Sequence, residues 1–391
     1  MFRDKMNISV FSQQHTGGMM KHGFLIKIFS TLLAGVLVLT GCAGQQSEPQ
    51  AAVQDTQAPQ TVDDQVEPVT TEAPTQAPTP EPTEEPTPVP TDTPAPTDTP
   101  TPAPTREPEE GDVCANFPDY DTGVDADYSY QSDELRIAIK KVVDEENVLT
   151  YFVADIWLRN YRSFRTAFGN GDFNSGTESA DSMCQRERAV LGITGSYNNG
   201  LTLHNGVRYK GISRELTREI CVIYRDGKMK TMDYSAAKFN DKKAVENGAW
   251  QAWQFGPIFI SDGVAKDGYK ENATRHPRCM LGYYEPGHYV LVLVDGRQGK
   301  EGYSIGMNYY EQVELMKSLG CVEAYNLDGG ESVRMVFMGE IINHPSGDRD
   351  GDGVADRNLL DMLVFAEYDL EGNAPSYEEV ADKVTIRTTV E

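Results

Sequence analysis

The sequence predicts an α+β domain built on a mixed β-sheet, with a β-α-β crossover that carries the candidate site and a disordered Pro/Thr-rich linker before it. Three observations lead to this class. Apolar runs of strand length are numerous and are separated by turn residues, helical periodicity is rare, and one strand–helix–strand succession spans 289–326. The composition divides the chain into segments 1–42, 43–112 and 113–391, and the fold class applies to the third.

The charge of the whole chain excludes one class of partner. Its 391 residues include 35 Lys and Arg against 60 Asp and Glu, which gives a formal net charge of -25. A protein this acidic is repelled by a phosphate backbone, so we expect no nucleic-acid partner. We also expect no organic cofactor.

Residues 1–42 are predicted to be a lipoprotein signal peptide. Lys21 and Lys27 precede an apolar stretch over 28–39, which is too short to span a bilayer comfortably. The ending Leu-Thr-Gly-Cys resembles a bacterial lipobox, in which the cysteine, here Cys42, is lipidated. The alternative is a cleaved secretory signal with an incidental cysteine. We therefore expect a cell-membrane lipoprotein on the extracytoplasmic face of a Gram-positive-type envelope, with its membrane contact through Cys42.

Residues 43–112 are predicted to be a disordered tether. Of the 22 prolines of the chain, 16 lie between Glu48 and Asp112, together with 15 acidic residues and a single Arg106. This composition cannot bury enough apolar surface to fold, and its prolines and like charges favour an extended polyproline II spacer. The tether would hold the third segment away from the membrane.

The cysteines of the third segment do not form a recognisable framework. They are Cys114, Cys184, Cys221, Cys279 and Cys321. Their number is odd, and no C-x-x-C or zinc-type spacing is present. The last four lie beside or within apolar stretches, where a cysteine is most often a small buried hydrophobic residue. The pairing of these five cysteines stays open.

Strands are predicted along most of the third segment. Five segments have strand character, and they are 151–157, 188–193, 219–224, 253–260 and 332–338. Asp226-Gly227, after the third of them, is typical of a β-hairpin turn.

The clearest structural pattern begins at residue 289. Residues 289–294 form a continuous apolar run, which indicates a strand buried on both faces. Asn308 and Glu311 form a capping pair for a helix over 309–319, and a short strand over 322–326 follows. A strand, a helix and a strand in this order usually form a right-handed parallel crossover.

This crossover predicts that two acids lie close together. Asp295 and Asp328 each follow one of its strands, and open α/β sheets place ligands at the carboxyl ends of strands. An alternative stays open for each acid. Asp328-Gly-Gly330 is also a good hairpin turn, and Asp295-Gly296 can simply end a strand.

Eight short motifs occur in one order along the third segment. They are Ile193-Thr-Gly-Ser-Tyr197, Asn205-Gly206, Phe255-Gly256-Pro257, His276-Pro-Arg278, Val294-Asp-Gly-Arg297, Ser304-Ile-Gly306, Ala324-Tyr-Asn-Leu-Asp-Gly-Gly330 and Asn343-His-Pro-Ser346. This ordered set resembles the phosphodiester glycosidase family, which includes N-acetylglucosamine-1-phosphodiester alpha-N-acetylglucosaminidase-like domains and bacterial exopolysaccharide-related members. The resemblance covers about 133–367.

The resemblance implies hydrolysis of a sugar-1-phosphodiester bond in a glycan or glycosyl-phosphate polymer. Such chemistry needs a carboxylate near the anomeric carbon, either to attack it or to activate water. Asp328 is the first catalytic candidate and Asp295 the second.

The resemblance also implies a set of substrate-binding residues, and they are Arg278, Arg297, Gly329, Gly330, Ser332, Arg357 and His276. The three arginines can neutralise a phosphate through bidentate hydrogen bonds. The two glycines allow their N–H groups to approach a phosphate or a sugar hydroxyl closely. The histidine either shuttles a proton or is an ordinary surface residue.

Three positions depart from the family pattern. Thr194 and Ser196 stand where relatives commonly carry Asn-Gly-Asp, and Glu331 stands where they carry a glycine. The first change removes an amide and a carboxylate, and the second adds a negative charge near the expected phosphate. Either change can alter the substrate or abolish activity. The alternative function is therefore a non-catalytic extracellular domain that binds glycans or phosphopolymers.

An acidic insertion near the end of this region carries a separate signal. Its acids are Asp348, Asp350, Asp352 and Asp356. With Gly353 at the sixth position, this spacing resembles the short Ca²⁺ loops of extracellular modules, although Leu359 stands where an EF-hand has its twelfth-position Glu. We expect a calcium site here, and the alternative is a solvated acidic turn.

Overall fold

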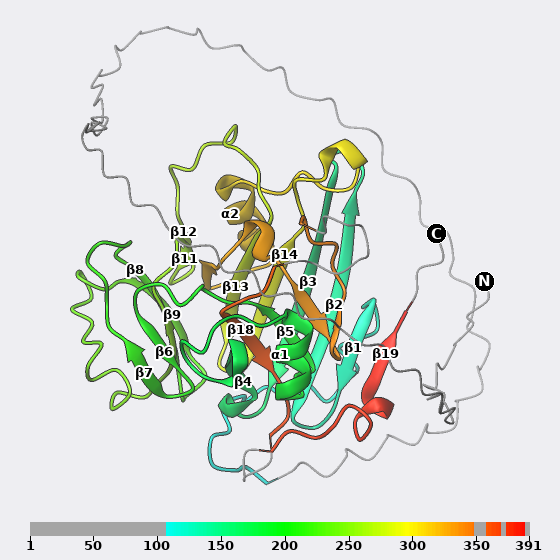
Figure 1. The fold of residues 1–391 in the computed structure, drawn as a ribbon. Helices are drawn as coiled ribbons and strands as arrows, with labels where there is room; N and C mark the ends of the chain where they lie inside the picture. The colour runs from blue at the N-terminus through cyan, green and yellow to red at the C-terminus, as the bar shows by residue number, and fades with distance from the viewer. Residues whose placement is uncertain (1–106, 348–356, 369–372, 388–391) are drawn as a thin grey trace, which may run out of the picture. The chain divides into compact units, whose positions relative to one another are not determined.

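A nine-stranded sheet lies at the centre of the fold (Figure 1). The computed structural model describes residues 107–347, 357–368 and 373–387. From one edge to the other, the strands of this sheet are β12 (Val264–Ala265), β11 (Ile258–Ser261), β15 (Glu323–Asn326), β13 (Arg278–Glu285), β14 (His288–Val294), β3 (Leu149–Leu158), β2 (Leu135–Asp144), β1 (Tyr128–Gln131) and β19 (Val384–Ile386).

Two five-stranded sheets and two α-helices accompany the central sheet within the described residues. The first small sheet contains, in spatial order, β7 (Val207–Lys210), β6 (Thr202–His204), β10 (Ala249–Trp253), β8 (Glu219–Tyr224) and β9 (Met229–Asp233). The second contains β17 (Glu340–Ile341), β16 (Met335–Phe337), β5 (Leu191–Thr194), β18 (Asp361–Phe365) and β4 (Phe164–Phe168). The helices are α1 (Ala180–Glu187) and α2 (Tyr309–Ser318).

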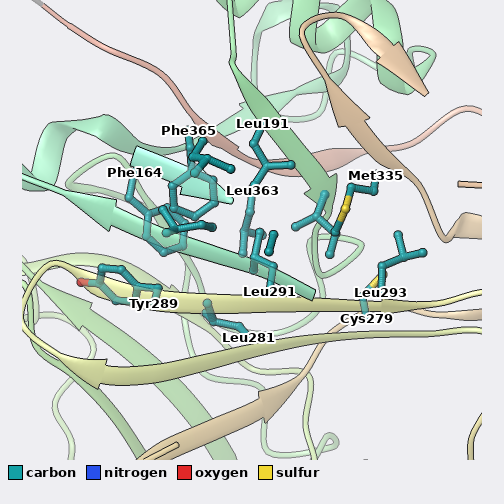
Figure 2. Close-up of a cluster of buried hydrophobic side chains, with 14 of the residues drawn as sticks. Phe164, Leu191, Cys279, Leu281, Tyr289, Leu291, Leu293, Met335, Leu363 and Phe365 are labelled. Atoms are coloured by element: carbon teal, nitrogen blue, oxygen red, sulfur yellow. The ribbon is translucent and has the colours of Figure 1, made fainter. Parts of the chain in front are cut away.

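The largest core lies between the central sheet and the second small sheet. Figure 2 shows Leu281 of β13 and Leu291 of β14 facing Leu363 and Phe365 of β18. Phe164 of β4 contacts the Phe365 ring at a centroid distance of 4.4 Å. Burial of these side chains is the main stabilising contribution that holds the two sheets together.

A helix covers the opposite face of the central sheet. Successive side chains of a strand point to opposite faces, so Val290 and Val292 of β14 point away from Leu291. They pack in a second core with Val313 and Met316 of α2. β14 is therefore buried on both faces, as its continuous apolar run predicts. In the same way, α1 covers the outer face of the second small sheet.

The two ends of the described domain meet in the central sheet. β19 pairs antiparallel with β1, and Figure 1 shows them side by side although they are far apart in the sequence. The Arg387 backbone N–H donates to the Asp127 carbonyl oxygen at 2.7 Å, and its guanidinium donates to the Ala126 carbonyl oxygen at 3.3 Å.

The predicted mixed sheet is wrong. Every registered strand pair among the described residues is antiparallel, from β1 with β2 to β18 with β5. The predicted crossover is not confirmed as a pair of adjacent strands, because β13 lies between β14 and β15 and is antiparallel to both. Sequence reasoning missed β13, although Glu285-Pro-Gly287 at its end is a good turn signal into β14.

Several predictions of individual elements are confirmed, in contrast to the predicted strand topology. The helix α2 is confirmed, with Asn308 and Glu311 forming a reciprocal capping box. The hairpin at Asp226-Gly227 is confirmed by the antiparallel pairing of β8 and β9. The strand expected over 253–260 is two strands, β10 and β11, which belong to different sheets.

Candidate active site

The candidate site forms where three segments meet at the ends of neighbouring inner strands of the central sheet. Register places Arg278 opposite Val294 and Met280 opposite Asn326. The start of β13 therefore lies between the ends of β14 and β15, and the loops that follow these two strands emerge on either side of it. Asp328 does not form a hairpin turn, because β15 and the next strand, β16, belong to different sheets.

Glycines allow the backbones of these segments to approach one another. A Cβ at Gly329 would lie 2.7 Å from the Pro277 carbonyl oxygen, and a Cβ at Gly306 would lie 2.4 Å from the His276 carbonyl carbon. Real Cβ atoms do not tolerate such distances to backbone. Gly330, with φ at 65°, donates its N–H to the Pro277 carbonyl oxygen at 3.0 Å.

A polar cavity of about 310 Å³ opens at these strand ends. Its lining residues are Arg297, Asp328, Gly329, Gly330, Glu331, Ser332 and Arg357. Except for Glu331, each was expected from the sequence to bind or transform the substrate. The charged side chains of this set are two guanidinium groups and two carboxylates.

Asp328 is the catalytic candidate that lines the cavity. Its Oδ1 accepts a hydrogen bond from the Gly329 N–H at 2.9 Å, and its own N–H donates to the Gly195 carbonyl oxygen at 3.0 Å. Burial raises the pKa of Asp328, while hydrogen bonds from Ser332 and Gly329 and the charge of Arg357 oppose this rise. The carboxyl is thus held in a fixed position, beside cationic groups suited to a phosphate.

Asp295 is placed differently from Asp328. It is 1% exposed and does not line the cavity. Its carboxylate accepts hydrogen bonds from Asn343 Nδ2 at 2.7 Å, Tyr303 Oη at 3.0 Å and the His344 N–H at 3.0 Å. Burial raises the pKa of Asp295, and these hydrogen bonds oppose the rise. The geometry gives this acid a role in fixing the loop around His344.

Arg278 and His276 lie beside the cavity without lining it. Arg278 Nε donates to the Met307 carbonyl oxygen at 3.2 Å, and its guanidinium lies 4.6 Å from the centre of the Tyr309 ring. The pKa of His276 is lowered, first by burial and then by the charges of Arg278 and Arg297. The lowered pKa favours the neutral form of the His276 imidazole.

The N–H groups of Gly329 and Gly330 were expected to bind a phosphate or a sugar hydroxyl, but the structure gives them partners within the protein. The Gly329 N–H donates to Asp328, and the Gly330 N–H donates to Pro277. Both donors are engaged within the protein. The two glycines instead permit the close packing that shapes the cavity.

Sequence reasoning missed a second acid near Asp328. Asp361, the first residue of β18, is 2% exposed. Its carboxylate accepts hydrogen bonds from the Ser196 N–H at 2.9 Å, the Tyr197 N–H at 2.8 Å and Ser196 Oγ at 3.3 Å. Burial raises the pKa of Asp361 to about 6, and the charge of Asp328 contributes to the rise. The available signal was an acid at the start of an apolar run.

Sequence reasoning also missed Arg334, which is 1% exposed. Its Nη1 donates to the carbonyl oxygens of Glu331 and Val333, each at 2.8 Å, and Nη2 has no hydrogen-bond partner among the described residues. Burial lowers the pKa of Arg334 to about 10, and the charge of Asp295 opposes this effect. The buried cation supports the backbone of the loop that carries Glu331.

The three departures from the family pattern all have contacts at the site. Thr194 Oγ1 donates to the Ser332 carbonyl oxygen and accepts from the Arg334 N–H at 2.9 Å. Ser196 binds the Asp361 carboxylate. Glu331 lies 3.8 Å from Arg297 in an ion pair, so one phosphate-binding candidate already has an anionic neighbour.

Two predicted sites lie outside the described residues. They are the lipidation site Cys42 and the calcium loop with Asp348, Asp350, Asp352 and Asp356. Within the described ranges, no group of three or more His, Cys, Asp or Glu side chains could hold a metal ion. No helix in those ranges is long and apolar enough to cross a membrane.

The five cysteines of the domain are free thiols. Cys184, Cys221, Cys279 and Cys321 are buried, as the apolar sequence around them predicts. Burial raises the pKa of all four thiols, which disfavours the thiolate form needed of a nucleophile.

Comparison with known proteins identifies a family and one relative. The family model described as phosphodiester glycosidase matches residues 170–366. The SPbeta prophage-derived uncharacterized protein YomE of Bacillus subtilis is 29% identical over 213 residues, which are 51% of this chain and 31% of that protein. This chain therefore matches less than a third of the length of that relative.

Solved structures of low sequence identity are also similar. The catalytic domain of zebrafish N-acetylglucosamine-1-phosphodiester alpha-N-acetylglucosaminidase, auto-inhibited by its pro-peptide, is 17% identical, with a TM-score of 0.47 over 63% of this chain and 86% of that one. A hypothetical protein from Synechocystis is 13% identical, with a TM-score of 0.45 over 60% of this chain and 62% of that one. Because the family model covers half of its residues, this chain belongs to the phosphodiester glycosidase family.

Proposed function

We propose that this chain hydrolyses a sugar-1-phosphodiester bond in a glycan or cell-wall polymer. Family membership indicates hydrolysis of glycosyl phosphodiester bonds as the general reaction. The observation that carries the proposal is the cavity itself, in which the carboxylate of Asp328 lies with the guanidinium groups of Arg297 and Arg357. An acid for the sugar and two cations for the phosphate are the groups that this reaction needs.

The roles of these residues follow from the charges that develop in the reaction. The bond between the anomeric carbon and the phosphate oxygen breaks, and the phosphate leaves with the electron pair. Arg297 and Arg357 stabilise the leaving phosphate. Asp328 stabilises the positive charge on the sugar and either attacks the anomeric carbon or takes a proton from the attacking water. The products are a free sugar and a phosphate monoester.

The cellular setting of the proposal rests on the sequence. We place the enzyme on the outer face of the cell membrane, anchored by the lipid on Cys42 and extended by the tether over 43–112. The acidic loop over 348–356 binds Ca²⁺ in this proposal. Because Arg357 follows this loop directly, a bound cation would fix one of the two phosphate-binding arginines.

One observation favours a second function. Glu331 forms an ion pair with Arg297 at 3.8 Å, so the positive charge available to a phosphate is partly offset. A cavity of balanced charge suits the recognition of a glycan or phosphopolymer without cleavage. The alternative is therefore a surface-anchored binding domain.

The decisive experiment distinguishes cleavage from binding. The purified full chain is incubated with methyl phosphodiesters of glucose 1-phosphate and N-acetylglucosamine 1-phosphate, in both anomeric forms, and free sugar is measured by chromatography. The matched controls are Asp328→Asn and Asp226→Asn, since Asp226 lies in an exposed hairpin turn. Sugar release by wild type and by Asp226→Asn, but not by Asp328→Asn, supports the proposal. Binding of these compounds without release would favour the binding domain.

A further inference from the structure

Asp328 and Asp361 both hydrogen-bond to the turn that follows β5. Ser196 and Tyr197 donate their N–H groups to the Asp361 carboxylate at 2.9 and 2.8 Å. In the same turn, the carbonyl oxygen of Gly195 accepts the Asp328 N–H at 3.0 Å. A Cβ at Gly195 would lie 2.3 Å from Asp361 Oδ2, so the turn can pack against this acid only because residue 195 has no side chain.

We propose that Asp361 and Asp328 act as one carboxyl pair, in which Asp328 ionises first and the buried Asp361 holds its proton longer as pH rises. Asp361 is a positioning residue, because it does not line the cavity. Two neighbouring carboxyls that are shielded from water cannot easily both carry a charge. The more exposed member of such a pair ionises first, and the buried member titrates later.

Burial favours the protonated form of Asp361 more strongly than its hydrogen bonds oppose it. Its pKa is raised to about 6, first by burial, and the hydrogen bonds from the turn only partly offset that effect. Asp328 is the charged group that acts on it from the loop after β15. β4 places Phe168 opposite Asp361, and β5 places Thr194 opposite the next residue, and neither side chain titrates near neutral pH. The cation Arg357, on the segment before β18, acts on Asp328.

The proton on Asp361 matters for a negatively charged substrate. In the described lining of the cavity, the positive charges of Arg297 and Arg357 are balanced by the negative charges of Asp328 and Glu331. When Asp361 ionises, a further negative charge appears behind Asp328, in surroundings that screen it poorly. A phosphodiester anion then binds more weakly. This step rests on the proposed function, and it predicts that KM rises with pH above about 6 while kcat changes less.

The pair itself can be tested without any substrate. Carboxyl ¹³C resonances of the full chain, labelled in its aspartates, are followed by NMR from pH 4 to 8 in wild type, Asp361→Asn and Asp328→Asn. We expect one resonance with a midpoint near 6 in wild type, its absence in Asp361→Asn, and a lower midpoint in Asp328→Asn, because the neighbouring charge is gone. The proposal is overturned if no aspartate titrates near pH 6, or if Asp328→Asn leaves that midpoint unchanged. The second variant retains Asp361, so the test stands even if Asp361→Asn fails to fold.

Kinetics test the effect of the pair on the reaction. KM and kcat for the methyl phosphodiester that the wild type cleaves are measured from pH 5 to 8. Whatever its absolute rate, Asp361→Asn should lose the rise in KM above pH 6, whereas wild type and Asp226→Asn should keep it. The same rise in Asp361→Asn would overturn the role in substrate binding. A wild type that releases no sugar from any probe, but shows the coupled titration, would reject the proposed function and leave the carboxyl pair intact.

Discussion

Replacement of Asp361 by Asn should change how the stability of the domain depends on pH. The pKa of this carboxyl rises from its ordinary value of 3.8 to about 6 on folding, mainly because the group is fully buried. Between these two values, the folded chain holds the proton more tightly than the unfolded chain does. The free energy of unfolding therefore falls as pH rises through this window, and the stability that the bound proton confers is lost once pH exceeds 6.

The size of this effect follows from the two pKa values. A pKa difference of this size corresponds to about 3 kcal/mol, since one pKa unit is about 1.4 kcal/mol. About 2 kcal/mol of this loss falls between pH 4.5 and 7.5. The rest falls below pH 4.5, where the carboxyl of the unfolded chain already loses its proton while that of the folded chain keeps it. An Asn at 361 has no proton to lose. Its imperfect hydrogen bonds with Ser196 and Tyr197 add a cost, but that cost does not vary with pH.

Urea denaturation of wild type and Asp361→Asn at both pH values measures the effect. Other groups, including Asp295, also make stability depend on pH, but they are present in both proteins and largely cancel in the difference. We expect the difference in the free energy of unfolding between wild type and variant to shift by about 2 kcal/mol from pH 4.5 to pH 7.5, to the disadvantage of the wild type. A difference that stays constant within about 0.5 kcal/mol would refute the reasoning, because single-residue effects of that size need no special cause.

Four further predictions concern the reaction, the cavity and the anchoring segments. Asp328→Asn should lower sugar release at least about 100-fold while leaving the circular dichroism spectrum unchanged, because the amide keeps the shape but not the charge; full activity would assign the chemistry elsewhere. Glu331→Gln should tighten binding of inorganic phosphate up to about fivefold in calorimetry, because it releases Arg297 from a partly exposed ion pair; an unchanged affinity would show that the pair does not compete with phosphate. Cys42→Ala should move the protein from the membrane fraction to the soluble fraction, and a variant that stays membrane-bound after a high-salt wash would exclude the lipid anchor. Calcium at about 0.1 to 1 mM should raise the melting temperature through the acidic loop over 348–356, whereas identical melting in calcium and in chelator would leave an acidic turn.

Local patterns predicted individual elements well because their causes are local. The helix α2 is fixed by a capping box that involves residues three apart, and the hairpin after β8 is fixed by Asp226-Gly227. The arrangement of strands is a different matter. Whether β14 lies next to β15 or next to β13 depends on hydrogen bonds between different segments of the chain. The pattern of apolar residues within β14 does not show which strands lie beside it.

The same distinction explains the outcome for the site. Asp328 and Arg297 belong to two of the ordered motifs that resemble the family, so the resemblance points to them. Asp361 contacts Ser196 across 165 positions of the chain. Nothing beside Asp361 in the sequence shows that its side chain is buried, and an acid at the start of a strand is usually exposed. A buried acid of this kind becomes visible only when the sheets are assembled.

The pairing of β1 with β19 means that the segment matched by the family model and the folding unit have different limits. A protein shortened to residues 170–366 would lack β1, β2, β3 and β19, which together make up one side of the central sheet. β14 would then become an edge strand, with apolar residues on both faces and unpaired backbone groups along its length. Such an edge invites pairing with another chain. Recombinant expression of this domain should therefore start before residue 128 and extend past residue 387, or aggregation would interfere with the assays.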